Sequence, residues 1–140
     1  MKNMYEIFDE VEAASGKKAK LLVLEKNLSP TLVKVLELTF HPSYQWLFTD
    51  IPENYKVPDT LPGMSYAQLS TEVRKFYMFR KGDETAEKLT PRKRHELLIQ
   101  LVESLSPREA EVVAGIFRKD QGVKGLDYEF VKQAFPQMLP

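Results

Sequence analysis

The sequence predicts an all-α protein with about seven or eight helices. Three observations support this fold class. Apolar residues recur at helical spacing in several segments, and a polar residue followed by proline opens three of them. No alternating strand pattern of useful length occurs. The 140 residues suffice for one domain with a hydrophobic core, so we expect a single helical domain over residues 1–140.

The amino-terminal third predicts three helices. In residues 3–14 the apolar residues fall at positions i, i+3, i+4 and i+7, which is one helical face. Gly16 suits the left-handed conformation that closes a helix, and Ser15 is a residue type that starts the next. The second helix spans about 17–26, and the third begins at Ser29-Pro30. The side chains expected to face inward are Met4, Ile7, Phe8, Val11, Leu21, Leu22, Leu24, Leu32, Val33, Leu36 and Phe40.

The segment 41–63 contains four prolines, and prolines at that density interrupt both helices and sheets. We expect one short helix near 43–48 and then a proline-rich loop over about 49–63. Trp46, Phe48 and Tyr55 predict that this segment packs on the core.

Four more helices are expected in the second half of the chain. One covers 65–80 and ends at Lys81-Gly82-Asp83. The next begins at Thr90-Pro91, and another begins at Ser106-Pro107 with Glu109 placed for a capping box and ends by Asp120. After a turn with two glycines over 121–126, a last helix spans 127–135 and ends at Pro136.

The residue inventory argues against an enzyme. No cysteine is present, which removes disulfides, thiolate nucleophiles and sulfur-ligated metals. His41 and His95 belong to no metal-binding or nucleophile motif, and no glycine-rich phosphate loop occurs. We therefore expect no catalytic residue, cofactor or metal. The absence of a long apolar run and of an apolar signal core predicts an intracellular protein with no membrane partner.

The charges cancel overall but are segregated along the chain. Twenty basic residues balance twenty acidic residues, so no bulk field draws the chain to nucleic acid. Residues 1–14 hold one lysine against four acids, whereas five lysines between residues 17 and 34 face only Glu25. Such clusters suit either phosphate binding or an ordinary solvated helix face. Further basic clusters are Arg74-Lys75, Arg80-Lys81, Arg92-Lys93-Arg94 and Arg118-Lys119, with Lys124 in the glycine turn.

Two runs of sequence resemble a known family. Ile7-Phe8-Asp9-Glu10-Val11, followed by the segment 15–20, resembles the opening of the T-even bacteriophage DNA ligases, in which a helical DNA-binding domain precedes the catalytic part. Arg118-Lys119-Asp120, the glycine turn 122–125 and Phe135-Pro136 follow a similar order. The chain also resembles short stand-alone proteins of unassigned function in T-even-like phages, in which Tyr5-Glu6-Ile7-Phe8, Trp46-Leu47 and residues 132–136 have matching places.

The resemblance implies a helical domain that lies against the minor groove of duplex DNA and contacts phosphates, mostly without reading bases. The phosphate-binding positions carried over are Lys17, Lys18, Lys20, Arg118, Lys119, Gly122, Lys124 and Gly125. Two features depart from the family. The lysyl-nucleotide motif Lys-x-Asp-Gly is replaced by Lys81-Gly82-Asp83-Glu84, so the chain is not expected to seal nicks. A zero net charge also differs from the positive excess usual in DNA-binding proteins.

We therefore hypothesise a non-enzymatic phage accessory protein of the host cytoplasm that binds duplex DNA through its phosphates, in replication or repair. The alternative is an adaptor that binds a phage or host protein and no DNA, through Tyr44, Trp46, Phe48 and Tyr55 if these are exposed. The DNA hypothesis gains support if Lys17, Lys18, Arg118, Lys119 and Lys124 converge on one concave face, and it loses support if they scatter. It fails if the lysines of 17–20 and Lys124 lie on opposite sides of the molecule.

Overall fold

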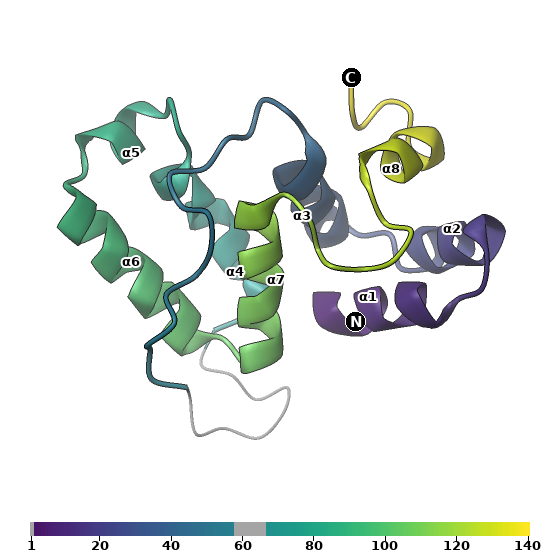
Figure 1. Ribbon diagram of the computed structural model, residues 1–140, viewed down its shortest axis with the longest axis horizontal. Coiled ribbons are helices and arrows are strands. Elements are labelled where there is room, and N and C mark those ends of the chain that lie inside the picture. Colours follow the sequence, from purple (N-terminus) through teal and green to yellow (C-terminus); the bar gives the residue numbers. More distant parts are fainter. Residues whose placement is uncertain (1, 58–66) are drawn as a thin grey trace.

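The structure is a computed structural model that describes residues 2–57 and 67–140. The described residues form eight α-helices, one 3-10 helix and one isolated antiparallel bridge, which confirms the predicted all-α class (Figure 1). The elements are α1 (Met4–Ala13), α2 (Lys17–Lys26), α3 (Pro30–Phe40), α4 (Leu69–Glu72), the 3-10 helix η1 (Val73–Phe79), α5 (Glu84–Lys88), α6 (Pro91–Ser104), α7 (Pro107–Arg118) and α8 (Tyr128–Ala134).

Helices α3 and α7 form the centre of the molecule. Figure 1 shows α1, α2 and α8 at one end of this pair and α5 and α6 at the other. Helix α7 contacts α1, α3 and α6, while η1 contacts α3 and α5. The first and last helices of the chain therefore share one end of the molecule.

Polar caps start the three helices that the sequence predicts to begin with a polar residue followed by proline. The Ser29, Thr90 and Ser106 side chains each accept a hydrogen bond from an amide in the first turn of α3, α6 and α7, and proline follows each cap. In a capping box the Glu109 carboxylate accepts from the backbone amide of Ser106. Here it accepts instead from the Ser106 hydroxyl, whose oxygen lies 3.0 Å from Glu109 Oε1. The second oxygen of Glu109 accepts from the Leu69 amide at 3.1 Å and ties α4 to α7.

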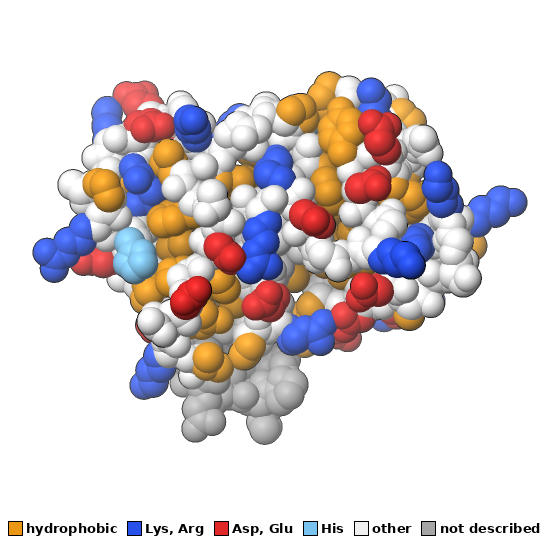
Figure 2. Space-filling view, in the orientation of Figure 1, with side chains coloured by type: hydrophobic (Ala, Val, Ile, Leu, Met, Phe, Trp, Pro, Cys, Tyr) orange, Lys and Arg blue, Asp and Glu red, His pale blue; other side chains and the backbone are white. Residues whose placement is uncertain are grey.

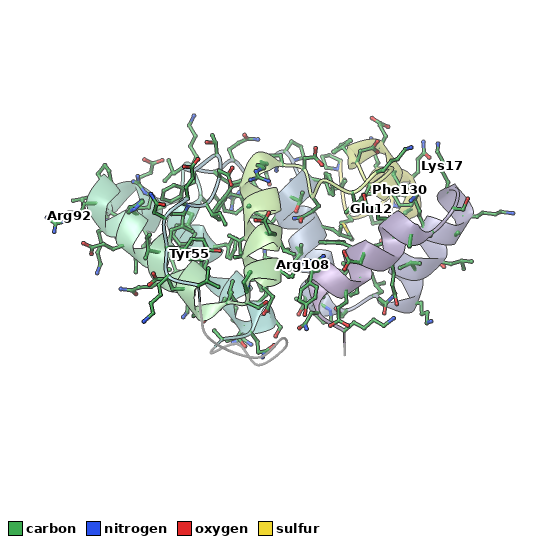
Figure 3. All side chains as sticks on the ribbon, turned by 60° about the horizontal axis from the view of Figure 1, so that its bottom comes forward. Glu12, Lys17, Tyr55, Arg92, Arg108 and Phe130 are labelled. Carbon is green, nitrogen blue, oxygen red and sulfur yellow. The ribbon has the colours of Figure 1, made fainter. Side chains whose placement is uncertain are left out.

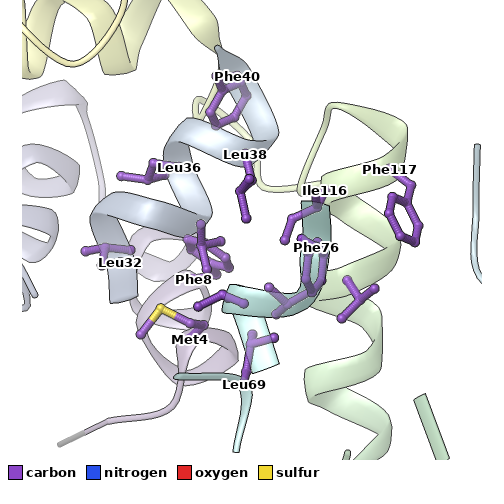
Figure 4. Close-up of a cluster of buried hydrophobic side chains, with 14 of the residues drawn as sticks. Met4, Phe8, Leu32, Leu36, Leu38, Phe40, Leu69, Phe76, Ile116 and Phe117 are labelled. Carbon is purple, nitrogen blue, oxygen red and sulfur yellow. The ribbon is translucent and has the colours of Figure 1, made fainter. Parts of the chain in front are cut away.

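The core lies between α1, α3, η1 and α7 (Figure 4). Leu32, Leu36 and Ile116 are fully buried there. A second, aromatic part of the core surrounds Phe117, whose ring centre lies 5.7–6.0 Å from those of Trp46, Phe48, Phe76 and Phe79. Trp46, Phe48 and Tyr55 pack against the core, as predicted.

The prediction of a short helix near 43–48 is wrong. This segment is extended at Trp46, which bridges to Arg80, and the Leu47 amide donates to the Phe79 carbonyl at 2.9 Å. Tyr44, Trp46 and Phe48 alternate along the segment, and all three pack against the core. An extended backbone places alternate residues on one side, whereas a helix would have separated them. Of the predicted loop 49–63, residues 58–63 lie outside the described residues.

The single helix predicted over 65–80 is also wrong. Residues 65 and 66 lie outside the described residues, and the remainder is the short helix α4 followed by the 3-10 helix η1. Val73, Phe76 and Phe79 are buried at intervals of three, which is the period of a 3-10 helix. The sequence prediction also missed α5, which Asp83 caps by accepting from the amides of Thr85 and Ala86.

Three local predictions need correction. Leu22 is 64% exposed because it lies on the outer face of α2, while Leu24 is fully buried. Of the two valines of α3, Val35 is buried and Val33 is only half-buried. Gly16, at φ +87°, is itself the N-cap of α2, so Ser15 does not start this helix.

Within residues 2–57 and 67–140, no helix has the length and apolar character needed to cross a membrane.

Candidate phosphate-binding site

The start of α2 and the turn before α8 line one hollow of about 590 Å³. Lys17 and Lys20 come from α2, and Lys124 and Gly125 come from the turn. In Figure 3, Lys17, Glu12 and Phe130 lie near one another at the same end of the molecule. Lys17, Lys20 and Lys124 therefore lie on the same side of the molecule and not on opposite sides.

Lys20 contacts both α1 and the turn before α8. Its ammonium donates a 2.7 Å hydrogen bond to the Val11 carbonyl in the last turn of α1, where the helix dipole favours a cation. Its side-chain carbons lie beside Gly125, where an added Cβ would be 3.1 Å from Lys20 Cε. Lys20 therefore positions α1, α2 and the turn, and its charge is directed at a backbone carbonyl.

Of the three lysines that line the hollow, Lys17 and Lys124 have ammonium groups that are available to bind a ligand. Both are exposed, and neither forms an ion pair with a carboxylate of the described residues. Lys17 is the first residue of α2, whose N-cap Gly16 provides no side-chain acceptor for the free amides. A helix start of this kind attracts anions through its amides and its partial positive charge. Lys18 is exposed beside Lys17 but does not line the hollow.

Three acidic residues share the hollow with the lysines, and sequence reasoning missed them. They are Glu12, Asp127 and Glu129. Asp127 is engaged as the N-cap of α8, where its Oδ1 accepts from the Phe130 amide at 2.9 Å. Figure 2 likewise shows acidic and basic side chains interspersed over one face of the molecule. The three carboxylates equal the three lysines of the hollow in number, so its net formal charge is zero and any anion must bind next to an exposed lysine.

Arg118 and Gly122 lie in a neighbouring hollow of about 380 Å³ between α1 and α7, which shares Glu12 with the first. Arg118 is bound to Asp50 by a two-pronged ion pair, with Nε–Oδ2 at 3.1 Å and Nη2–Oδ1 at 2.9 Å. Desolvation raises the pKa of Asp50, but hydrogen bonds from Arg118 and the Ile51 amide outweigh it and lower the pKa below its ordinary value. The Gly122 amide donates to Asp120 Oδ1 at 2.8 Å.

Lys119 is turned inward. At φ +62° it ends α7 in the left-handed conformation, and its ammonium donates to the carbonyls of His41 and Tyr44 at 2.9 and 2.8 Å. Burial lowers the pKa of Lys119 to about 8. Lys119 therefore links the ends of α7 and α3.

The predicted site residues thus fall into three groups, so the five expected cations do not all converge on one concave face. The structure brings Lys17, Lys20, Lys124 and Gly125 together with Lys18 beside them, places Arg118 and Gly122 in the adjoining hollow, and directs Lys119 inward. Within residues 2–57 and 67–140 no group of histidine and carboxylate side chains is placed to hold a metal ion.

The aromatic surface considered for a protein partner is not free. Tyr44, Trp46, Phe48 and Tyr55 are half-buried and pack against the core. The condition that they be exposed is therefore not met.

The sequence profile of one protein family matches residues 7–124, which is most of the chain. That family is described as a family of unknown function, DUF6433. The match includes α2 and Lys124, and lysines from both line the hollow at the start of α2. No curated protein sequence matches the chain.

Proposed function

We propose that this chain, which belongs to the DUF6433 family, is a non-enzymatic protein that binds the phosphate backbone of duplex DNA, as an accessory to replication or repair. The observation that carries the proposal is the meeting of Lys17 and Lys124 in one hollow at the uncapped start of α2. The resemblance of these segments to the DNA-binding domain of phage ligases supports the same function.

The geometry suits backbone contacts better than base readout. A phosphodiester carries one negative charge and accepts hydrogen bonds from ammonium groups and from amides at a helix start. Lys17, Lys18 and Lys124 provide the ammonium groups, and the first turn of α2 provides the amides. Such contacts fix position on the duplex without recognising sequence.

The test is a fluorescence-anisotropy titration of labelled nicked and intact duplexes at low salt. The triple variant Lys17→Gln/Lys18→Gln/Lys124→Gln removes three exposed positive charges. We expect its affinity to fall at least tenfold on both duplexes. The matched control, Arg92→Gln/Lys93→Gln/Lys132→Gln, removes three exposed charges from α6 and α8 and should change affinity less than threefold. Equal losses in both triple variants would contradict the proposed location, and no binding by the wild type would contradict the function.

A protein-binding adaptor is the second candidate, favoured by Leu22. This residue is 64% exposed, flanked one turn away on α2 by Lys18 and Lys26. A protein partner can cover an exposed leucine, although contiguous apolar patches, and not single apolar residues, are what mark an interface. Affinity capture after nuclease treatment distinguishes the two functions. A stoichiometric protein partner that the Leu22→Ser variant fails to retain would favour the adaptor over DNA binding.

A further inference from the structure

Three cationic side chains converge on Tyr44, which follows the carboxyl end of α3. The Lys34 ammonium donates to the Tyr44 hydroxyl at 3.0 Å. The Arg80 guanidinium carbon lies 4.3 Å from the centre of the Tyr44 ring. From the protein side, the Lys119 ammonium donates to the Tyr44 carbonyl at 2.8 Å.

This cluster carries a surplus of positive charge. Within the described residues none of the three cations forms an ion pair with a carboxylate, and Glu37, on the last turn of α3, pairs with none of them. The carboxyl end of α3 contributes roughly half a negative charge through its carbonyl groups. That partial charge offsets only a fraction of three positive charges, so the cluster attracts an anion from solvent.

The cations are held in place before any ligand arrives. Trp46 stacks on the Tyr44 ring with 10° between the ring planes, and the Arg80 guanidinium also donates to the Ser43 carbonyl at 3.0 Å. Lys34 is fixed by its hydrogen bond to Tyr44. Side chains already fixed in this way lose little conformational entropy on binding, so the full electrostatic attraction is available to the ligand.

We propose that Lys34 and Arg80 form a second anion site that binds a phosphate group. A guanidinium fits two oxygens of a phosphate, and the neighbouring Lys34 ammonium provides a second positive charge. Lys119 contributes positive potential from beneath Tyr44 and does not contact the ligand. The shared chemistry is a phosphate group, whether it belongs to a nucleic-acid backbone or to a small free phosphate compound.

Trp46 provides a direct readout, because it is the single tryptophan of the chain and its ring stacks on Tyr44. Inorganic pyrophosphate is titrated at constant ionic strength while tryptophan fluorescence is recorded. We expect a saturable change that requires at least tenfold more pyrophosphate in Lys34→Gln/Arg80→Gln. The control Arg92→Gln/Lys93→Gln, which removes two exposed charges from α6, should give the wild-type curve.

A second variant guards against loss of structure at Arg80. The single variant Lys34→Gln leaves the guanidinium and its contact with Tyr44 in place, and we expect it to need at least threefold more pyrophosphate. No saturable change in the wild type, or equal curves for wild type and both site variants, would overturn the proposal. Competition by an intact duplex identifies a nucleic-acid backbone as the source of the phosphate, and its absence identifies a small phosphate compound. Either result is independent of the anisotropy test of Lys17 and Lys124.

Discussion

Lys20 lies across Gly125, with its Cε 3.1 Å from the position that a Cβ on residue 125 would occupy. This contact joins the first turn of α2 to the turn that precedes α8. Together with the hydrogen bond from Lys20 to the Val11 carbonyl, it brings Lys17 and Lys124 into one hollow. The candidate site therefore depends on a glycine that tolerates both a positive φ and a close neighbour.

The Gly125→Ala variant tests this dependence. Residue 125 has φ +84°, a conformation that costs an L-residue about 1–2 kcal/mol, and the new methyl group would also press on Lys20. We expect Gly125→Ala to lower the free energy of unfolding by about 2 kcal/mol, measured by urea denaturation. Gly82→Ala is the control, because Gly82 has φ +88° and open space around it. If the two variants lose the same stability, the Lys20 contact contributes nothing.

Gly115 and Gln121 form a coupled pair. A Cβ at Gly115 would lie within 2.9 Å of Gln121 Nε2, which donates to Thr39 Oγ1 and the Val112 carbonyl at 3.1 Å each. Alanine at position 115 favours the helix by about 1 kcal/mol over glycine. It also displaces Gln121 and breaks its two hydrogen bonds, which contribute about 1 kcal/mol each. We expect Gly115→Ala to destabilise the wild type by about 1 kcal/mol and to stabilise the Gln121→Ala variant by about 1 kcal/mol. Thermal unfolding of the four proteins measures both effects, and the same sign in both backgrounds would refute the coupling.

Lys119 gives the fold a specific dependence on alkaline pH. Its pKa is about 8 in the folded chain against an ordinary value of 10.5. Between these values the unfolded chain binds more protons than the folded chain, so stability rises as pH rises through this window. We expect urea midpoints of the wild type to increase from pH 7.5 to 9.5 relative to those of Lys119→Met. If the urea midpoints of the wild type and of Lys119→Met change equally with pH, the hydrogen bonds to the carbonyls keep the Lys119 ammonium charged in spite of its burial.

Phe76 and Tyr77 test the register of η1. Phe76 is 1% exposed with its ring centre 5.9 Å from that of Phe117, whereas its neighbour Tyr77 is 49% exposed. Truncation of a buried phenylalanine typically costs 3–5 kcal/mol, so Phe76→Ala should lose about that much stability. Tyr77→Ala should lose less than about 1 kcal/mol in the same chemical denaturation. A reversed order would show that the buried face of this segment is different.

Local signals made much of the fold predictable. The starts of α3, α6 and α7 follow from Ser29, Thr90 and Ser106, because a cap and its amide partner lie within three residues of each other. The missed elements depend on distant partners. Trp46 is extended because it pairs with Arg80, and η1 is a 3-10 helix because its buried residues at intervals of three face the aromatic core. The alternation of Tyr44, Trp46 and Phe48 was a usable strand signal, but prolines on either side obscured it.

The candidate site was predictable only in part. The predicted site residues included Lys17, Lys124 and Gly125, which line one hollow. No spacing rule reveals that the Lys20 ammonium donates to the Val11 carbonyl. Arg118 and Lys119 are adjacent in sequence and differ completely in role. Helix α7 ends between them, and the left-handed backbone at Lys119 turns its side chain inward while Arg118 stays exposed beside Asp50. Counting charges along the sequence also missed that Glu12, Asp127 and Glu129 gather around the lysines.

The most direct test of the phosphate-binding proposal is the salt dependence of duplex affinity for the wild type and for Lys17→Gln/Lys124→Gln. Each phosphate contact contributes roughly −0.9 to the slope of log affinity against log salt, so three contacts from Lys17, Lys18 and Lys124 predict a slope of about −3. The double variant should retain a slope of about −1. A slope near zero in the wild type, or an unchanged slope in the variant, would contradict a phosphate site at the start of α2.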